Sequence, residues 1–329
     1  MADENQPLLA PQPAGPRRED PRARAQEGHA SSERRALELS VLAVAVLLYV
    51  AAVAWSLSAT FASEPQTLGF KHLTGNISAM YPTDITPANW VFAICALIYV
   101  WQGAWLLFAL TFPCRTRVTR TIPLLVYLPF SIACACNFAW VYLWANEIVA
   151  GALAVSIVFA ISLILSVIFA LRNIGLDGNH EGDEDDWREK LNRWATYVLV
   201  HNGLALFASW LCIAWLLNMS IVADKNNKLG GAILREDAGT VALSLLTAEI
   251  IVWFLLEQTV LEKYVRYIYT IYPVLIVFLV GVLVEHWNKG MEESRNHIFA
   301  LGVLVLVGVL QVARLVFAVI FYLVRRRQP

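Results

Sequence analysis

The stretch Thr86-Pro-Ala-Asn-Trp-Val-Phe-Ala-Ile-Cys-Ala-Leu-Ile-Tyr-Val-Trp-Gln-Gly-Ala-Trp105 decides how the rest of this sequence is interpreted. Pro87 stands at the start of an apolar run, where its missing N–H costs a helix nothing. No charged residue follows before Arg115, so the run is long enough to cross a bilayer, which requires about 20 apolar residues. Trp and Tyr usually gather at the membrane surfaces, whereas here they also occupy the middle of the run. The pattern predicts a membrane helix that lines an aromatic pocket.

The composition of the whole chain is typical of a polytopic membrane protein. Of 329 residues, 58% are hydrophobic and 16% are charged, whereas a soluble domain carries about 25% charged residues. The five cysteines lie in or beside apolar runs, which predicts no disulfide framework. The sequence contains no zinc-ligand spacing, no phosphate-binding glycine loop and no hydrolase or metalloprotease motif. The sequence therefore contains no indication of an enzyme, a metal site or a nucleic-acid partner.

Eight apolar runs meet the length that a membrane-spanning helix requires. Only helices or closed barrels satisfy their backbone in lipid, and unbroken runs of this length indicate helices. The sequence thus predicts an all-α integral membrane protein with eight transmembrane helices. The runs are Ala36–Ala62, Ala88–Phe112, Thr121–Ala145, Ile148–Leu171, Tyr197–Ala223, Gly239–Leu261, Tyr267–Val284 and Ile298–Val324.

The Lys and Arg residues in the connections predict the orientation, because cytosolic loops carry an excess of basic residues. Eighteen of the 25 basic residues fall in the N-terminal segment, in every second connection and at the C-terminus, and six fall in the others. This alternation places both termini in the cytosol. A membrane of the endosomal and lysosomal system, or another membrane of the secretory pathway, is the expected location.

The N-terminal segment 1–35 is rich in Pro, Arg, Glu and Ala without apolar periodicity, which predicts a disordered cytosolic tail. Within it, Glu4 precedes Leu8 and Leu9 at the spacing of the acidic dileucine signals that clathrin adaptors bind on lysosomal membrane proteins. A chance match in a Pro-rich tail is the alternative.

An Asn-X-Ser sequence at Asn76 lies in the predicted non-cytosolic loop 63–87. Such a sequence accepts a glycan when it is exposed in the secretory lumen. Asn218-Met-Ser220 also matches, but it lies inside an apolar run that a glycosyltransferase could not reach.

Two further apolar runs combine aromatic rings with a buried amide. One carries Asn137, Trp140 and Trp144, which share a helix face because they are three or four residues apart. The other carries Trp210 and Asn218. An Asn in a membrane helix needs a partner helix or a polar cavity. Flat rings with a few amide groups would suit a planar hydrophobic ligand, and simple packing of the helix bundle is the alternative.

Three motifs in order resemble the TspO/MBR family of tryptophan-rich sensory and translocator proteins. They are Pro87-Ala-Asn-Trp90-Val-Phe92 running to Tyr99, Asn137-Phe-Ala-Trp140, and Ser209-Trp210 running to Leu217-Asn218. The sequence departs from the family pattern at Ile94, Cys95 and Ala96, where a Pro and a Trp are usual. The resemblance covers about residues 36–223.

The resemblance implies a five-helix bundle that binds porphyrins, sterols or synthetic aromatic ligands, so haem or another porphyrin is a possible ligand and no cofactor is certain. The loop 63–87 would close this pocket as a lid. Seven residues would line it: Trp90, Tyr99, Asn137, Trp140, Trp144, Trp210 and Asn218. The remaining chain divides into a non-cytosolic loop 224–238, a three-helix extension 239–324 and a basic tail 325–329.

The predicted extension contains two charged residues near the middle of apolar runs, Glu249 and Arg314. A charge at the bilayer centre costs at least about 2.5–3.5 kcal/mol, so each should have a partner, and their similar depth predicts that they pair with each other. The pair could be a structural clip or the coupling site of a proton- or anion-coupled transporter. A membrane scaffold is a third hypothesis, and Gly302 and Gly308 are compatible with either a homodimer or packing within the chain.

Overall fold

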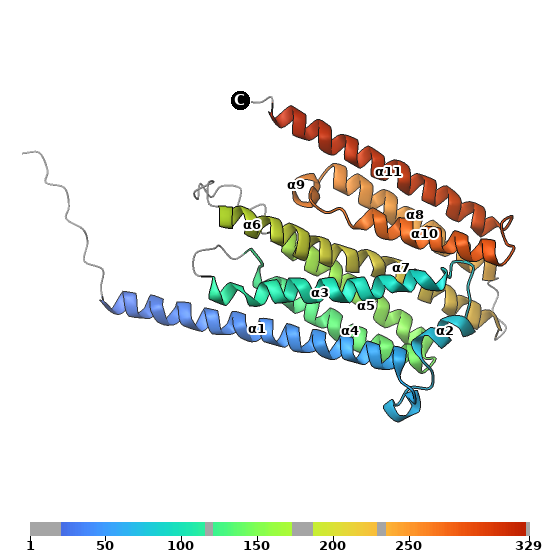
Figure 1. Cartoon of the computed structure of the whole chain (residues 1–329), viewed down its shortest axis with the longest axis horizontal. Helices are drawn as coiled ribbons and strands as arrows, with labels where there is room; N and C mark the ends of the chain where they lie inside the picture. Colours follow the sequence, from blue (N-terminus) through green and yellow to red (C-terminus); the bar gives the residue numbers. More distant parts are fainter. Residues whose placement is uncertain (1–20, 116–120, 173–186, 229–234, 327–329) are drawn as a thin grey trace, which may run out of the picture. The chain divides into compact units, whose positions relative to one another are not determined.

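The computed structural model describes residues 21–115, 121–172, 187–228 and 235–326 (Figure 1). These residues form helices and connections, with no strand among them. The predicted sorting signal at Glu4, Leu8 and Leu9 lies outside the described residues.

The helices differ in length from a single turn to 41 residues. The α-helices are α1 (Pro21–Phe61), α2 (Thr74–Met80), α3 (Ile94–Leu110), α4 (Tyr127–Ala145), α5 (Val149–Arg172), α6 (Trp187–Ala195), α7 (Asn202–Lys228), α8 (Arg235–Gln258), α9 (Glu262–Val265), α10 (Ile271–Asn288) and α11 (Arg295–Arg326). Short 3₁₀ segments are η1 (Pro65–Leu68), η2 (Asn89–Ala93), η3 (Phe112–Cys114) and η4 (Leu124–Val126), and η6 (Thr196–His201) is a π-helix.

Eight helical segments of the described chain are long and apolar enough to cross a membrane, and each coincides with one predicted run. The prediction of an all-α, multi-pass membrane protein is therefore confirmed. Helix α1 begins at Pro21, so the described structure places residues 21–35 of the predicted tail in a helix. Pro is favourable in the first turn, and the Ala, Arg, Gln and Glu residues that follow it have high helix propensity.

Residues 41–329 form one compact unit, and residues 1–40 form another. Helix α7 is the most buried of the membrane spans and packs against α3, α5, α8 and α10. Helix α7 therefore contacts helices of the predicted five-helix bundle and of the predicted three-helix extension, and both belong to one unit. Because α7 ends at Lys228 and α8 begins at Arg235, both ends of the predicted loop 224–238 are helical. Bulky side chains that are fully buried in this unit include Trp105, Phe130, Tyr272 and Phe278.

The stretch Thr86–Trp105 begins at a point where the backbone packs directly against α10. The backbone N–H of Ala88 donates to the carbonyl oxygen of Gly281 at 3.0 Å. A Cβ atom on Gly281 would lie 2.2 Å from a methyl group of Val91, so only glycine allows this crossing. The entry to α3 therefore rests on α10.

A π-helical segment joins α6 to α7, and side-chain amide and indole groups donate to carbonyl groups within it, just after it and in the loop before α10. The Trp101 indole N–H donates to the carbonyl of Val198 at 3.1 Å, and the Gln102 amide donates to the carbonyl of Gly203 at 2.8 Å. The Asn202 amide donates to the carbonyls of Tyr197, at 2.9 Å, and Tyr267, at 2.7 Å. These bonds fix the loop before α10 against the start of α7.

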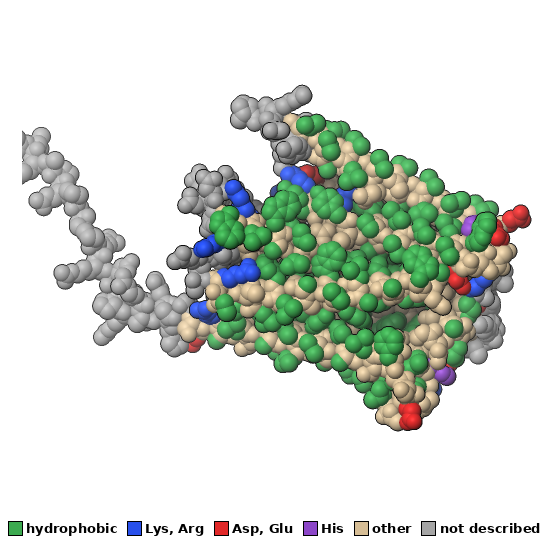
Figure 2. All heavy atoms as spheres, in the orientation of Figure 1, with side chains coloured by type: hydrophobic (Ala, Val, Ile, Leu, Met, Phe, Trp, Pro, Cys, Tyr) green, Lys and Arg blue, Asp and Glu red, His purple; other side chains and the backbone are tan. Residues whose placement is uncertain are grey.

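On the face of the bundle shown in Figure 2, hydrophobic side chains cover most of the surface, and the Lys and Arg side chains lie mainly at one end. That end, called the basic end below, is where Arg115 contacts Asn192 and where Asn202 binds the loop before α10. At the opposite end Asp237 pairs with Arg295.

Candidate functional site

The side chain of Ser56 joins three helices inside the bundle. Its Oγ accepts hydrogen bonds from the Tyr99 hydroxyl at 3.1 Å and from the Asn137 amide at 3.2 Å, and donates to the carbonyl of Ala52 at 2.9 Å. Tyr49 adds a bond from its hydroxyl to the carbonyl of Tyr99 at 2.5 Å. Helices α1, α3 and α4 are thus connected by a buried polar network that includes two of the predicted pocket residues.

Aromatic rings lie beside this network on the same helices. The Trp55 ring stacks on Phe138 with centroids 4.4 Å apart and meets the edge of Phe70 at 4.7 Å. The predicted residues Trp140 and Trp144 stack on each other at 5.3 Å. The sequence analysis missed Trp55 and Phe70, because neither is part of a family motif and Phe70 reaches the bundle only through the folding of its loop.

The loop 63–87 covers the end of the bundle where these rings lie. Its Phe70 is 1% exposed, and the indole N–H of Trp144 donates to the carbonyl of Thr74 at 3.1 Å. Helix α2 within the loop presents Asn76 to solvent. The loop thus packs against α1 and α4 at this end of the bundle.

Glu147, in the turn between α4 and α5, binds two side chains of the loop 63–87. Its carboxylate contacts His72 Nε2 at 2.9 Å and accepts the Tyr81 hydroxyl at 2.9 Å, and its backbone carbonyl accepts the Lys225 ammonium at 3.2 Å. The Tyr81 hydrogen bond and, to a smaller extent, His72 lower the pKa of Glu147 below its ordinary value of 4.5. Glu147 also has a φ of 62°, a left-handed conformation that the tight turn imposes.

The other predicted pocket residues have separate surroundings. Trp90 is 51% exposed on η2, outside the bundle. Trp210 meets Phe92 edge-on at 6.2 Å. The Asn218 amide donates to the carbonyl of Ala214, one turn away on its own helix. One cavity lined by all seven predicted residues is therefore absent from the described residues.

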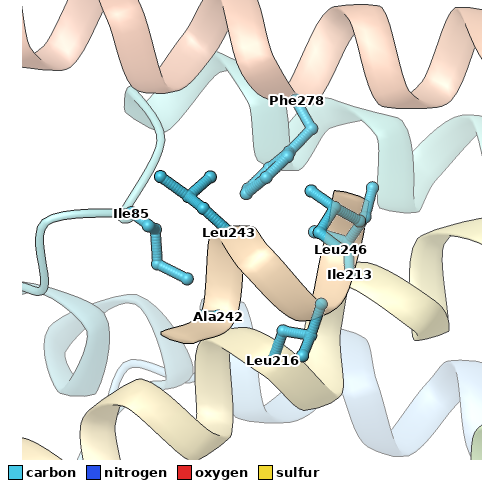
Figure 3. A pocket seen from close by; sticks show the side chains of 7 residues that line it. All are labelled: Ile85, Ile213, Leu216, Ala242, Leu243, Leu246 and Phe278. Atoms are coloured by element: carbon cyan, nitrogen blue, oxygen red, sulfur yellow. The ribbon is translucent and has the colours of Figure 1, made fainter. Parts of the chain in front are cut away.

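One gap in the bundle is lined by residues other than those of the Ser56 network. This gap, between α7, α8, α10 and the loop 63–87, has about 180 Å³ of empty space but no position that accommodates a water molecule (Figure 3). Only apolar side chains line it: Ile85, Ile213, Leu216, Ala242, Leu243, Leu246 and Phe278. A ligand could enter this gap only if the side chains that line it moved.

The predicted pairing of Glu249 with Arg314 was wrong. Arg314 Nε lies 2.6 Å from Glu257 Oε1, and both side chains are at most 5% exposed. Glu249 instead accepts the indole N–H of Trp215 at 3.2 Å. Its other carboxylate oxygen is buried without a hydrogen-bond partner.

The directions in which side chains leave α8 explain why Arg314 pairs with Glu257 and not with Glu249. Glu249 and Glu257 are eight residues apart, which turns them about 80° from each other around the helix. Glu249 faces α7, whereas Glu257 faces α10 and α11, where the Tyr272 hydroxyl donates to its Oε2 at 2.7 Å. Helices α8 and α11 start at the same end. Counting 1.5 Å per residue, Arg314 lies about 28 Å from its helix start, compared with about 33 Å for Glu257 and about 21 Å for Glu249.

Comparison with protein families gives a match to the family described as TSPO-like protein, over residues 40–320. The chain belongs to the TSPO-like protein family. The match includes α8, α10 and α11, so the family relationship extends beyond the residues 36–223 over which the motifs were recognised.

No curated protein and no solved structure matches this TSPO-like chain. The membership shows a membrane protein of the TspO kind, and its ligand must be argued from the residues described above.

Proposed function

We propose that this TSPO-like protein binds a planar hydrophobic ligand, such as a porphyrin or a sterol, between α1, α3 and α4 beneath the lid. The observation that carries the proposal is the network of Ser56, Tyr99 and Asn137 next to the stacked rings of Trp55 and Phe138. Such a site offers flat apolar faces together with a small number of orienting polar groups, as ligand sites generally do.

Ligand entry beneath the lid requires the loop 63–87 to move, because Phe70 and Thr74 of this loop pack on Trp55 and Trp144. The lid has a defined fastening at Glu147, which can be released without changing any ring. The seven-residue site predicted from sequence is accordingly narrowed to Tyr99, Asn137 and Trp140, with Trp55 and Phe138 added.

The test is a titration of the purified full-length protein with protoporphyrin, followed by the porphyrin absorbance rather than by the fluorescence of 12 tryptophans. Asn137→Ala and Trp140→Phe should weaken saturable binding. Asn288→Ala and Trp187→Phe are matched controls, because both residues are exposed and lie away from the network. Glu147→Gln should accelerate ligand association without removing binding. Porphyrin affinity that is unchanged in a folded Asn137→Ala, Trp140→Ala double variant would overturn the site.

Glu249 supports a second candidate, a proton-coupled transporter. It lies near the middle of α8 with one buried carboxylate oxygen unpartnered, and no basic side chain of the described residues contacts it. Ionisable groups inside a membrane span commonly mark proton or ion pathways. Glu249→Gln should abolish a pH-dependent flux in proteoliposomes while leaving expression and melting temperature intact. A loss of folding would instead indicate a structural role.

We infer that the basic end faces the cytosol, because basic residues are concentrated in cytosolic connections. This orientation would expose Asn76 to the lumen for glycosylation and the N-terminal dileucine segment to clathrin adaptors. Endosomal or lysosomal residence remains part of this proposal.

A further inference from the structure

Helix α6 carries apolar residues on its outward face and polar residues on its inward face, which is the reverse of a helix in water. Trp187, Leu191 and Trp194 are 65%, 60% and 55% exposed. At 3.6 residues per turn they fall within an arc of about 60°. The buried residue of α6 is Asn192.

Polar contacts fix the helix in this orientation. Arg115 Nη1 donates to Asn192 Oδ1 at 3.3 Å, and the Thr196 hydroxyl donates to the carbonyl of Asn192 at 2.9 Å. The Thr196 hydroxyl also contacts the hydroxyl of Thr121, which precedes the membrane span of α4. The apolar stripe therefore faces outward because its opposite face is held by the bundle.

The stripe of α6 continues into the surface that faces the lipid. Trp194 meets the ring of Tyr197 at 5.9 Å and that of Tyr267 at 5.5 Å. Val198, one turn further along, is 49% exposed at the start of the membrane span. Trp and Tyr are the residues that concentrate at the level of lipid headgroups. The stripe thus extends the membrane-facing surface beyond the apolar span.

Basic residues flank the stripe on both sides. Around the helix, Lys190 lies about 60° from Trp187 on one side, and Arg188 lies about 100° from it on the other. Arg193 and Arg115 add positive charge at the same level. A helix with an apolar stripe and flanking basic residues is typical of binding to anionic membrane surfaces.

We propose that α6 binds anionic phospholipids of the leaflet at the basic end, with Trp187, Leu191 and Trp194 at the boundary between headgroups and acyl chains. Lys190 and Arg193 contact the lipid phosphates. The acidic run Asp183–Asp186, which precedes α6 in the sequence and lies outside the described residues, opposes this attraction. The binding surface is independent of the proposed ligand site.

The experiment places an environment-sensitive fluorophore on Leu191→Cys in a Cys114→Ser background, using full-length protein in lipid nanodiscs. Cys114 is the exposed native cysteine, and the Cys114→Ser parent measures background labelling. Adding phosphatidylserine to phosphatidylcholine nanodiscs should lower the quenching of the fluorophore by aqueous iodide severalfold. Lys190→Gln and Arg193→Gln should each weaken the phosphatidylserine effect about fivefold, and high salt should abolish it. Replacing Asp185 and Asp186 with Asn should enhance it.

The control is a fluorophore on Asn288→Cys, an exposed position at the opposite end of the bundle, which should respond equally to both lipid compositions. Equal quenching of the Leu191→Cys label with and without phosphatidylserine would overturn the proposal. It would indicate instead that the stripe binds a protein partner. Labels equally protected in pure phosphatidylcholine would also overturn it, because insertion would then be apolar and without headgroup recognition.

Discussion

Replacing Arg314 with Leu should destabilise the protein strongly, because it leaves a buried carboxylate without its cation. Arg314 Nε is 2.6 Å from Glu257, Nη2 donates to the carbonyl of Val265 at 3.2 Å, and the guanidinium lies 5.1 Å from the Tyr269 ring centroid. Removing one partner of a buried pair costs about 3–5 kcal/mol. Glu257 is one residue from the end of α8, where water is near, so the lower part of this range applies.

The matched variants separate charge from packing. Arg314→Lys keeps the charge and loses the bond to Val265, so it should cost about 1.5–3 kcal/mol, the value of a charged hydrogen bond. The double replacement of Arg314 and Glu257 by Leu should be close to wild type, because replacing a whole buried pair with apolar residues is often neutral or stabilising.

Thermal unfolding in detergent at a fixed heating rate measures these effects. At about 2–4 °C per kcal/mol, Arg314→Leu should lower the melting temperature by about 6–12 °C. A melting temperature within about 2 °C of wild type, or a double variant as unstable as the single variant, would refute the interpretation of Arg314 and Glu257 as a clip.

Three other predictions concern the lid and the crossing of α10. Gly281→Ala should lower the free energy of unfolding by about 1–3 kcal/mol, because its Cβ would overpack against Val91. Adding Val91→Ala should restore part of this loss, as measured by thermal unfolding. The pKa of Glu147 is lower when folded than when unfolded, so the stability that it adds is present above its ordinary pKa of 4.5 and is lost as the pH falls through the folded value. The protection of the lid amides, measured as their exchange rate relative to the intrinsic rate at each pH, should therefore decrease on acidification in the wild type and not in Glu147→Gln. Equal changes in protection in the two proteins would contradict this role. Asn76→Gln should abolish a shift in mobility on glycosidase treatment of protein from animal cells, and an unshifted wild type would show that the site is unused.

The sequence predicted the membrane spans because the bilayer demands runs of about 20 apolar residues whatever the neighbouring helices are. Thr86–Trp105 contained enough apolar length to identify a span, and its motif together with those at Asn137–Trp140 and Ser209–Asn218 indicated the family. The same local signals did not predict the helix at residues 21–35, where good helix formers lack any apolar periodicity that would have marked them as helical.

The partners of the polar residues were decided by tertiary structure alone. Sequence indicated that Asn137 and Arg314 each needed a partner, since burying an unpaired polar group in lipid is costly. It could not indicate Ser56 or Glu257, because helix rotation and register depend on how neighbouring helices pack. The turn of α8 directs Glu249 to Trp215 and away from Arg314.

The sequence by itself therefore determined that this chain is an eight-helix membrane protein of the TspO kind, since length, hydropathy and short motifs are properties of single segments. Only the tertiary structure decided that residues 41–329 form one unit, that Glu147 binds the loop 63–87, and that the stripe of α6 faces outward. These features arise from contacts between residues that are far apart in the chain, and the pattern of any one segment does not specify them.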